Sequence, residues 1–348
     1  MSNQKELLQL LFSPDQANVM LALEIAKGKP DINLKPLLDG YFTLYKCFFD
    51  KNLKQLESKQ IAQLNQPEIY SYQPILDFFP PEISQLKNLQ KLELRNNQLT
   101  SLPAEIGQLK NLQILFLLNN ELTTLPSEIG QLQNLLSLSI TNNKLISLPP
   151  EVGQLKNLRT LGLNSNQLTC LPPEIGRLKN LETLHLHNNR LTSFPSEISQ
   201  LKNLHQLDLA TNRLSIFFPE ITNLPALESL SLSHNQLPLL PPEIAYLKVL
   251  KSLHLENNQL TTLPSEIGQL KCLQMLRINN NQLSSLPPEI GQLRNLKALN
   301  LGENQLSSLP NEMSDLENLE ELYLYDNLIS EKEQRRIKKR LPHCHIKF

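Results

Sequence analysis

The chain has 348 residues, and 33 Lys and Arg balance 34 Asp and Glu, so the formal net charge is −1. This balance argues against a nucleic-acid partner, as do the absence of Trp and an aromatic content of 5%, because base-stacking platforms need aromatic side chains. No apolar run is long enough to span a bilayer, so we expect no membrane insertion.

The N-terminus and the cysteines predict a cytoplasmic location. Met1 to Phe12 show no basic segment followed by an apolar run, so no secretory signal is expected. Cys47, Cys170, Cys272 and Cys344 lie far apart and form no C-x-x-C pair. We therefore expect reduced thiols in a cytoplasmic protein.

Residues 1–65 show helical patterning and no repeat. Ser13-Pro14-Asp15-Gln16 is read as a capping box with Pro at the first helical position, and Gly28 is expected to end that helix. Two further helices are predicted over Leu37 to Phe49, interrupted at Gly40, and over Leu53 to Leu64. We interpret this segment as an α-helical N-terminal cap that covers the first strand edge, with a separate binding module as the alternative.

Residues 66–88 are predicted to be a degenerate junction repeat. Ile69, Phe79 and Ile83 keep the frame of the units that follow, while Pro74 replaces their Asn. This segment joins the helical cap to the regular array.

From Leu89 the chain repeats every 23 residues, eleven times, without insertion or deletion. The units begin at Leu89, Leu112, Leu135, Leu158, Leu181, Leu204, Leu227, Leu250, Leu273, Leu296 and Leu319. Leu115 and Leu117 alternate with outward residues, and this period of two indicates a short strand. A unit cannot bury its leucines alone, so neighbouring units must stack into a parallel sheet over residues 89–328, with caps at both ends.

Every unit carries Asn at the same position after its strand. The column is Asn97, Asn120, Asn143, Asn166, Asn189, Asn212, Asn235, Asn258, Asn281, Asn304 and Asn327. An amide offers donors and acceptors, so these side chains are expected to be buried and to satisfy backbone groups where each strand turns.

The second half of the unit reads L-P-x-E-I-G-x-L. Pro cannot extend a sheet, so it should direct the chain to the convex side. Ser caps or Pro at the first helical position, followed by Glu, predict a short helix or 3₁₀ turn, as at Pro126-Ser127-Glu128 or Pro287-Pro288-Glu289. The Glu column is interpreted as structural.

The unit L-P-x-E-I-G-x-L-x-N-L-x-x-L-x-L-x-x-N-x-L resembles that of bacterial leucine-rich repeat proteins with 23-residue repeats. It is also similar to the repeat of the plant intracellular Ras-group-related leucine-rich repeat family. The resemblance covers residues 89–348. It implies an α/β leucine-rich repeat solenoid, a horseshoe with a concave parallel β-sheet, short helical or 3₁₀ convex segments and the helical N-terminal cap. It implies little about function, because such proteins share the scaffold and vary its face.

Residues 329–348 are predicted to form a C-terminal cap. Glu331 to Arg340 indicates a helix, Leu341-Pro342 ends it, and His345 to Phe348 is expected to add a final strand. The basic residues of this helix are interpreted as a solvated helix face and not as a phosphate or nucleic-acid site.

Three groups of outward residues are predicted to bind a partner on the concave face. They are the apolar strand Ile114, Phe116 and Leu118; the pair Tyr323 and Tyr325; and the polar group His185, His187, Asp208, His254, Glu256 and Arg277. The alternatives are that the helical cap folds over the first group, that the C-terminal cap packs on the second, and that two copies form a homodimer through the apolar strand.

His185-x-His187 beside Asp208 also has the chemistry of a zinc site. A metal-dependent enzyme built on these residues is the weakest alternative, because exposed polar histidines on a strand face need no metal. The histidines would make binding sensitive to pH near neutrality. Separately, Phe217-Phe218-Pro219 breaks the repeat, and Phe218 is expected to be exposed on the convex side.

The sequence thus predicts a non-catalytic protein–protein interaction scaffold with a protein partner and without a cofactor or metal. No nucleophile elbow or phosphate-binding loop is present among its motifs. An exported structural or adhesion protein is the main alternative.

Overall fold

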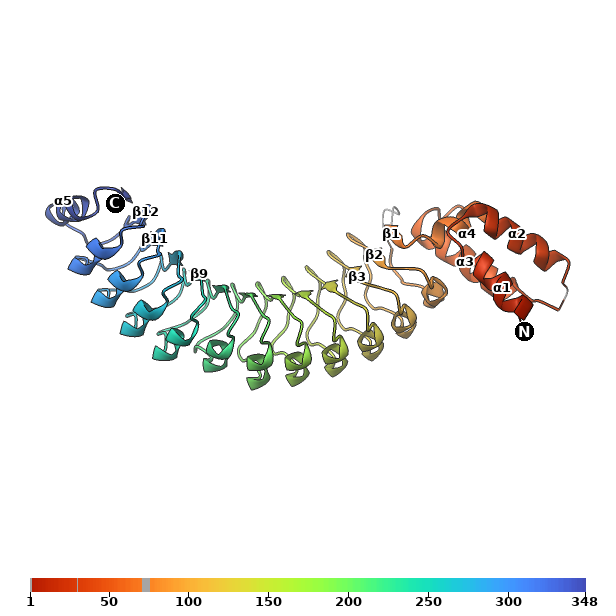
Figure 1. The fold of residues 1–348 in the computed structure, drawn as a ribbon, viewed down its shortest axis with the longest axis horizontal. Coiled ribbons are helices and arrows are strands. Elements are labelled where there is room, and N and C mark those ends of the chain that lie inside the picture. The colour runs from red at the N-terminus through yellow and green to blue at the C-terminus, as the bar shows by residue number, and fades with distance from the viewer. Residues whose placement is uncertain (1, 30, 71–75) are drawn as a thin grey trace. The chain divides into compact units, whose positions relative to one another are not determined.

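The computed structural model describes residues 2–29, 31–70 and 76–348, so Pro74 of the junction repeat lies outside the described residues. The chain divides into two compact units, unit 1 (Met1–Leu161) and unit 2 (Gly162–Phe348), and Figure 1 follows it from the N-terminus to the C-terminus. Across the part of the chain that the structure describes, no helix combines the length and apolar character needed to cross a membrane.

Unit 1 begins with four α-helices. They are α1 (Ser2–Leu11), α2 (Gln16–Lys27), α3 (Lys35–Phe48) and α4 (Ser58–Leu64). Helix α2 is capped by Asp15, whose carboxylate accepts a hydrogen bond from the Ala17 amide at 2.7 Å, and it ends at Gly28 as expected. The predicted start at Ser13 and Pro14 is wrong, because the Ser13 hydroxyl accepts from the Asp15 amide at 3.1 Å and forms the turn before the helix.

The next two helices also differ from their predicted bounds. Helix α3 runs through Gly40 without interruption, and a Cβ atom there would overlap the side chain of Gln85. Gly40 therefore permits close packing and does not break the helix. Helix α4 starts at Ser58 and not at Leu53, because Glu57 forms the capping box with Gln60, whose Oε1 accepts from the Glu57 amide at 3.0 Å.

Buried polar contacts join the helices to the first repeat. The Tyr41 hydroxyl, in a fully buried side chain, donates to Oδ1 of Asn65, and burial raises the pKa of Tyr41 far above its usual value. The Asn65 amide donates to the carbonyl of Leu11 at 2.8 Å. Asn88 donates to the Phe12 carbonyl at 2.6 Å, so the helical segment and the start of the array share hydrogen bonds.

Thirteen short strands occur among the described residues, and within each unit they pair in parallel in chain order. They are β1 (Glu68–Tyr70), β2 (Lys91–Glu93), β3 (Ile114–Phe116), β4 (Ser137–Ser139), β5 (Thr160–Gly162), β6 (Thr183–His185), β7 (Gln206–Asp208), β8 (Ser229–Ser231), β9 (Ser252–His254), β10 (Met275–Arg277), β11 (Ala298–Asn300), β12 (Glu321–Tyr323) and β13 (His345–Lys347).

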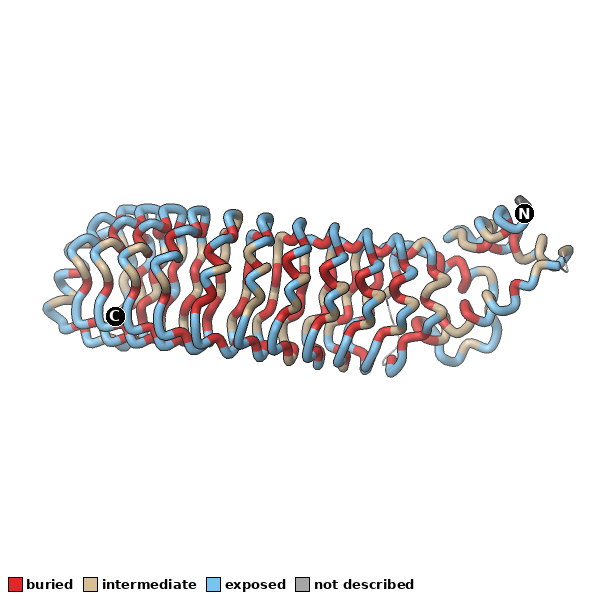
Figure 2. Tube along the Cα trace, turned by 90° about the horizontal axis from the view of Figure 1, so that it is seen from below, coloured by how far each residue is buried: buried red, intermediate tan, exposed pale blue. Residues whose placement is uncertain are grey.

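The core leucines set the register of the strands. In unit 1 Leu92 pairs with Leu115 and Leu115 with Leu138, and all three side chains are fully buried. The same column continues in unit 2 from Leu184 to Leu322. Figure 2 shows the result as buried residues that recur in each coil of the chain. Burying each leucine contributes about 1.5–3 kcal/mol, so the stacked core supplies most of the stability.

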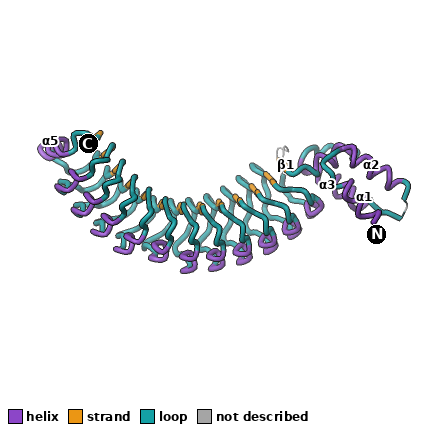
Figure 3. Tube along the Cα trace, viewed as in Figure 1, coloured by secondary structure: helices purple, strands orange, loops and turns teal. Residues whose placement is uncertain are grey.

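In the described part of the chain, eleven 3₁₀ helices of five residues each lie opposite the strands. They are η1 (Pro81–Gln85), η2 (Ala104–Gln108), η3 (Ser127–Gln131), η4 (Pro150–Gln154), η5 (Pro173–Arg177), η6 (Ser196–Gln200), η7 (Pro219–Asn223), η8 (Pro242–Tyr246), η9 (Ser265–Gln269), η10 (Pro288–Gln292) and η11 (Asn311–Asp315). Figure 3 shows that, within unit 2, the strands lie along the inner side of the curve and these helices along the outer side.

The predicted Ser caps are wrong. In η3, Pro126 is the N-cap residue with φ −69° and ψ 149°, and it makes no side-chain capping bond. Ser127 is instead the first residue of the helix, and its hydroxyl donates to the carboxylate of Glu128 at 3.0 Å. Pro thus starts the helix through its restricted φ and its missing N–H.

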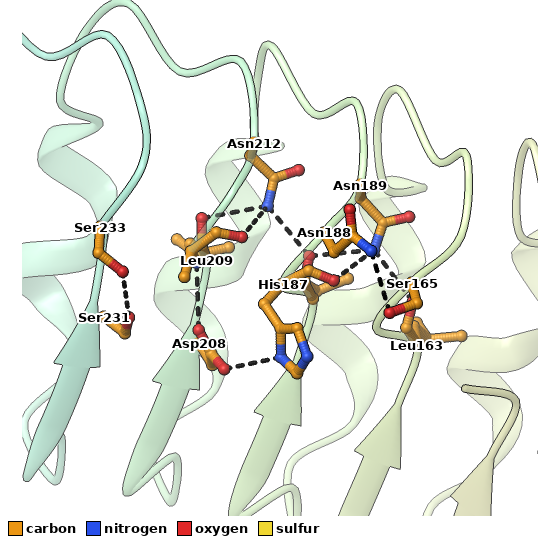
Figure 4. Close-up of polar contacts among 12 residues, drawn as sticks. Leu163, Ser165, His187, Asn188, Asn189, Asp208, Leu209, Asn212, Ser231 and Ser233 are labelled. Atoms are coloured by element: carbon orange, nitrogen blue, oxygen red, sulfur yellow. Dashed lines mark hydrogen bonds and ion pairs between the residues drawn. The ribbon is translucent and has the colours of Figure 1, made fainter. Parts of the chain in front are cut away.

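The asparagine column is buried and bonded as predicted, except that Asn327 is only half-buried. Asn212 is typical: its amide donates to the carbonyl of Leu209 at 3.1 Å (Figure 4) and to that of Leu186 at 3.0 Å. Its Oδ1 accepts from the Leu191 amide at 3.0 Å. Each such side chain therefore ties its own repeat to the preceding one.

The residue before each Asn of this column adopts the left-handed conformation, with φ between 51° and 58°. Asn occupies most of these positions, as at Asn96, Asn119 and Asn188, because Asn tolerates positive φ better than most residues. Thr211, His234 and Glu303 take the same backbone conformation in unit 2, where the surrounding repeat imposes it.

On the side of the repeat that carries the 3₁₀ helices, called here the turn side, a row of Asn and a row of Gly link neighbouring repeats. Asn134 donates to the Lys110 carbonyl at 2.8 Å, and Asn203 donates to the Lys179 carbonyl at 2.9 Å. A Cβ atom on Gly107 would lie 2.6 Å from the Glu128 carbonyl oxygen, so Gly permits the close approach of these two 3₁₀ helices.

Unit 2 breaks both rows between residues 199 and 272. Ser199, Thr222 and Ala245 replace the Gly, and Ala226, Val249 and Cys272 replace the Asn. The irregular Phe218 is buried and not exposed, which corrects the prediction. Its ring packs on Phe194 with the centroids 5.6 Å apart, so the extra aromatic ring fills space inside the turn region.

The C-terminal elements agree with their predicted positions. Helix α5 (Glu331–Arg340) is capped by the Ser330 hydroxyl, which accepts from the Glu333 amide. Strand β13 pairs in parallel with β12 and covers the last strand edge. Exposed Arg335 pairs with Glu331 within the helix, as expected for a solvated helix face.

Candidate functional site

The outward positions of the strands carry the predicted site residues, and three columns face outward. The first column holds the residue before the first core leucine of each strand, and the second holds the residue after that leucine. The third column holds the residue two positions after the second. In β3 these are Ile114, Phe116 and Leu118.

The apolar group of unit 1 is half-buried and not fully exposed. Ile114, Phe116 and Leu118 are all of intermediate exposure. The Arg95 guanidinium lies 5.2 Å from the centroid of the Phe116 ring, in cation–π range, and Arg95 also pairs with Glu93 at 3.2 Å. The neighbouring strand therefore supplies polar cover for this apolar strand.

His187 and Asp208 form a direct pair in unit 2. Nδ1 of His187 lies 2.8 Å from Oδ2 of Asp208, and Oδ1 of Asp208 accepts from the Ala210 amide at 3.1 Å (Figure 4). Both oxygens of this carboxylate are thus engaged, and the imidazole is oriented by it.

His185 and His254, the other two histidines of the polar group, line a shallow hollow of about 210 Å³, which is named here the histidine hollow. It is bounded by His185, Gln206, Asp208, Ser229, Ser231 and His254. Burial lowers the pKa of His185 and of His254 below the usual value, against the opposing effects of Asp208 and of Glu256. Both imidazoles are therefore neutral at neutral pH and offer hydrogen bonds without charge.

The zinc alternative has no geometric support in the residues that the structure describes. Among them, no cluster of three or more His, Cys, Asp or Glu side chains has the arrangement to hold a metal ion. His187 and Asp208 bond to each other, while His185 lines the histidine hollow.

A second hollow, of about 320 Å³, lies near the end of the array and is named here the C-terminal hollow. Its main lining residues are Glu256, Met275, Arg277, Ala298, Glu321 and Tyr323. It brings Glu256, Arg277 and Tyr323 together, whereas the sequence placed the first two in the polar group and the third in the tyrosine pair. Tyr325 lies beside it with its ring over Gly302, where a Cβ atom would overlap that ring.

Tyr323 has one polar partner on its own strand, β12, and one on the neighbouring strand β13. Its hydroxyl donates to the Glu321 carboxylate at 3.0 Å, and this bond raises the pKa of Tyr323. Nζ of Lys347, on β13, lies 5.0 Å from the ring centroid. The C-terminal cap thus contacts Tyr323 through Lys347, while the ring still lines the hollow.

Sequence reasoning missed Met275, Ala298 and Glu321 in this hollow. They occupy the first outward column, which the sequence interpretation used only for Ile114. Reading that column along the array would have placed a small residue, Ala298, between two long ones. That contrast is the sequence signal of a hollow on a pleated surface.

A profile of the leucine-rich repeat region matches residues 78–157, 147–239 and 239–343. The solved structure of the leucine-rich repeat protein LIC12759 from Leptospira interrogans is 41% identical, with 86% of this chain and 94% of that chain covered and a TM-score of 0.58. The chain belongs to the leucine-rich repeat family. A comparison with curated protein sequences gives no match.

Other leucine-rich repeat structures resemble this one. The plant peptide hormone receptor RGFR1, solved in complex with RGF2, is 33% identical, with 76% of this chain and 48% of that chain covered and a TM-score of 0.62. An internalin, InlF of Listeria monocytogenes, is 21% identical, with coverages of 90% and 94% and a TM-score of 0.64, and it shows likeness of fold alone. Leucine-rich repeat proteins are typically protein-interaction scaffolds, and their concave surfaces serve binding.

Proposed function

We propose that this leucine-rich repeat protein is a non-catalytic scaffold that binds a protein partner through the outward residues of its strands. One observation carries the proposal: the outward positions change from repeat to repeat and line open hollows. Other side chains, such as those of Asn212 and Asn203, form hydrogen bonds between repeats and are not available to a partner. The variable residues are therefore the ones available to a partner.

A rigid backbone supports this role. The leucines and asparagines fix each strand against its neighbours, so little backbone entropy is lost when a partner binds. Tyr323, Tyr325 and Phe116 supply aromatic area of the kind that dominates interface energies. Complexes of structural neighbours with peptides, such as that of RGFR1 with RGF2, support a protein partner.

The test is affinity capture from a lysate of the source cell with matched variants. One variant carries Phe116→Ser and Leu118→Ser in unit 1, and a second carries Tyr323→Ser and Tyr325→Ser in unit 2. The control carries Ile216→Ser and Leu239→Ser, because these side chains are 58% and 55% exposed and lie in loops outside the strands. All three variants remove apolar area in the same way.

We expect a partner that wild type and control retain and that at least one strand-face variant loses. A partner retained by all variants would place recognition elsewhere, on the helices or the turn side. Light scattering of wild type and the unit 1 variant tests the homodimer: loss of a dimer in that variant would assign the apolar strand to self-association.

A cytoplasmic location forms part of the proposal. The four cysteines are free in the structure, and Cys170 and Cys272 are exposed, which suits a reducing compartment. Cell fractionation with thiol labelling checks this. Recovery from the medium, with no partner from the cell interior, would favour the exported structural or adhesion role.

A further inference from the structure

The C-terminal hollow exists because β11 carries small outward residues between two strands with long ones. Ala298 lies between Met275 on β10 and Glu321 on β12, in register. In the next column Asn300 lies between Arg277 and Tyr323. The long side chains of β10 and β12 thus form walls, and the short side chains of β11 form the floor between them. The volume of about 320 Å³ admits one long side chain of a partner.

One wall of this hollow holds a carboxylate oxygen that lacks a hydrogen-bond donor. Oε2 of Glu256 is inaccessible to solvent and has no partner within the described part of the chain, and the Glu256 side chain is only 18% exposed. Leaving such an oxygen without a donor destabilises the folded state, and more so when the carboxylate is charged. Because the Glu256 side chain lines the hollow, a small rotation of its carboxylate brings this oxygen within reach of an incoming donor.

The groups near Glu256 do not neutralise it. Nδ1 of His254 is 3.9 Å from Oε1 of Glu256, and burial lowers the pKa of His254, so this imidazole is neutral at neutral pH. Arg277 also lines the hollow, but it is exposed and forms no ion pair with any described residue. The second carboxylate of the hollow, Glu321, accepts from Tyr323 and is exposed to water, whereas Oε2 of Glu256 has neither a donor among the described residues nor contact with water.

Building on the proposed function, we propose that the C-terminal hollow receives a basic side chain, Lys or Arg, of the protein partner, with the Glu256 carboxylate as its acceptor. The aliphatic stem of such a side chain contacts Met275 and Ala298, and the charged head supplies the donor that Oε2 of Glu256 lacks. Charge-assisted hydrogen bonds of this kind are about twice as strong as neutral ones.

The charge of Arg277 distinguishes a basic ligand from an acidic one. As an unpaired cation at the same hollow, it repels a basic ligand and competes with it for Glu256. Removing the charge of Glu256 must therefore weaken the binding of a basic ligand. Removing the charge of Arg277 must leave the affinity for that ligand unchanged or raise it. An acidic ligand bound through Arg277 would show the opposite signs.

The chain contains four methionines, so ¹³C-methyl labelling of Met gives few signals, and Met275 reports from inside the hollow. Buried Met313 and exposed Met20, on α2, serve as internal controls. The full-length protein is titrated with the blocked peptide acetyl-Gly-Arg-Gly-amide. Matched peptides carry citrulline, which is neutral and nearly isosteric with Arg, or Glu at the central position.

We expect a saturable shift of Met275 alone with the Arg peptide, with millimolar affinity because one side chain makes few contacts. The citrulline peptide should bind about tenfold more weakly. Glu256→Gln should abolish this difference, and Arg277→Gln should preserve it. Unchanged Met20 and Met313 signals in both variants show that the fold is intact.

Three results would overturn the proposal: no shift of Met275 with the Arg peptide, equal binding of the Arg and citrulline peptides, or a Glu peptide whose binding needs Arg277. These outcomes concern the hollow alone. Capture of a partner that depends on the strand face would still support the proposed function, so the two ideas fail separately.

Discussion

The strand side and the turn side of each repeat obey the same 23-residue period but use it differently. On the turn side, Gly107 is packed against the next repeat and Asn203 is bonded to the previous one. On the strand side, the outward residues change from Phe116 to Asp208 to Tyr323 without altering the pairing of the strands. Positions that contact a neighbouring repeat are therefore constrained, and positions that face solvent are free to acquire a partner.

The largest effect should come from the buried asparagine column. Asn189→Ala leaves the Leu168 amide and the carbonyls of Leu163 and Leu186 without their side-chain partner, so we expect a loss of about 1–3 kcal/mol in the free energy of unfolding. Asn203→Ala is the matched control, because this exposed side chain donates one hydrogen bond to the backbone, at the Lys179 carbonyl. Urea denaturation measures both, and equal losses would show that burial does not distinguish the two rows.

Overpacking on the turn side should rank next. Gly176→Val places a branched side chain against the backbone of Glu197, and we expect destabilisation of about 1–3 kcal/mol. Gly302→Ala is the matched comparison on the strand side, where the added atom meets only the movable ring of Tyr325. In thermal unfolding, the midpoint temperature should fall clearly for Gly176→Val and change little for Gly302→Ala. A larger shift for Gly302→Ala would reverse the contrast between the two sides.

Acid should destabilise unit 2 modestly. His185 and His254 have a pKa in the folded state below the usual value because they are buried, so the unfolded chain binds more protons in this range. Stability is therefore fully present above about pH 6.5 and falls as the pH drops toward the lowered values. Unfolding midpoints at several pH values in that window measure the slope, and the double variant His185→Gln and His254→Gln should flatten it. An unchanged slope would assign the pH dependence to other groups.

The smallest effect on stability should come from the proposed contact surface. Tyr325→Ser removes a half-buried ring that rests on Gly302, and we expect a change within about 0.5 kcal/mol. Denaturation of this variant beside wild type checks it. A loss comparable to that of Asn189→Ala would mean that the ring belongs to the packing of the array and not to its binding face.

The repeat made much of the fold predictable. Because each unit has the same length, Leu115, Asn120 and Pro126 each represent a whole column, and their burial or turn role follows from one unit. The helical segment has no such redundancy, so no second copy of the motif could correct the predicted start at Ser13 and Pro14 to the observed cap at Asp15.

The candidate site was less predictable. Its outward residues could be named from the alternation along each strand, but their grouping depends on the sizes of the side chains on adjacent strands. Arg277 and Tyr323 share a hollow because Ala298 is small, and the Phe116 ring is half-buried because Arg95 lies over it. Phe218 was misplaced for the same reason, since its burial depends on the Phe194 ring one repeat earlier.

The bonds of the buried asparagines also restrict how the length of this protein can change during evolution. Asn189 bonds to groups 26 and 21 residues earlier, and Asn212 repeats both spacings. Inserting one residue between the partners would shift every outward residue of the adjoining strand and break these bonds. A whole duplicated repeat preserves them all. Gene changes that lengthen or shorten the array should therefore be tolerated in steps of 23 codons, and each step adds one new set of outward residues on which selection can act.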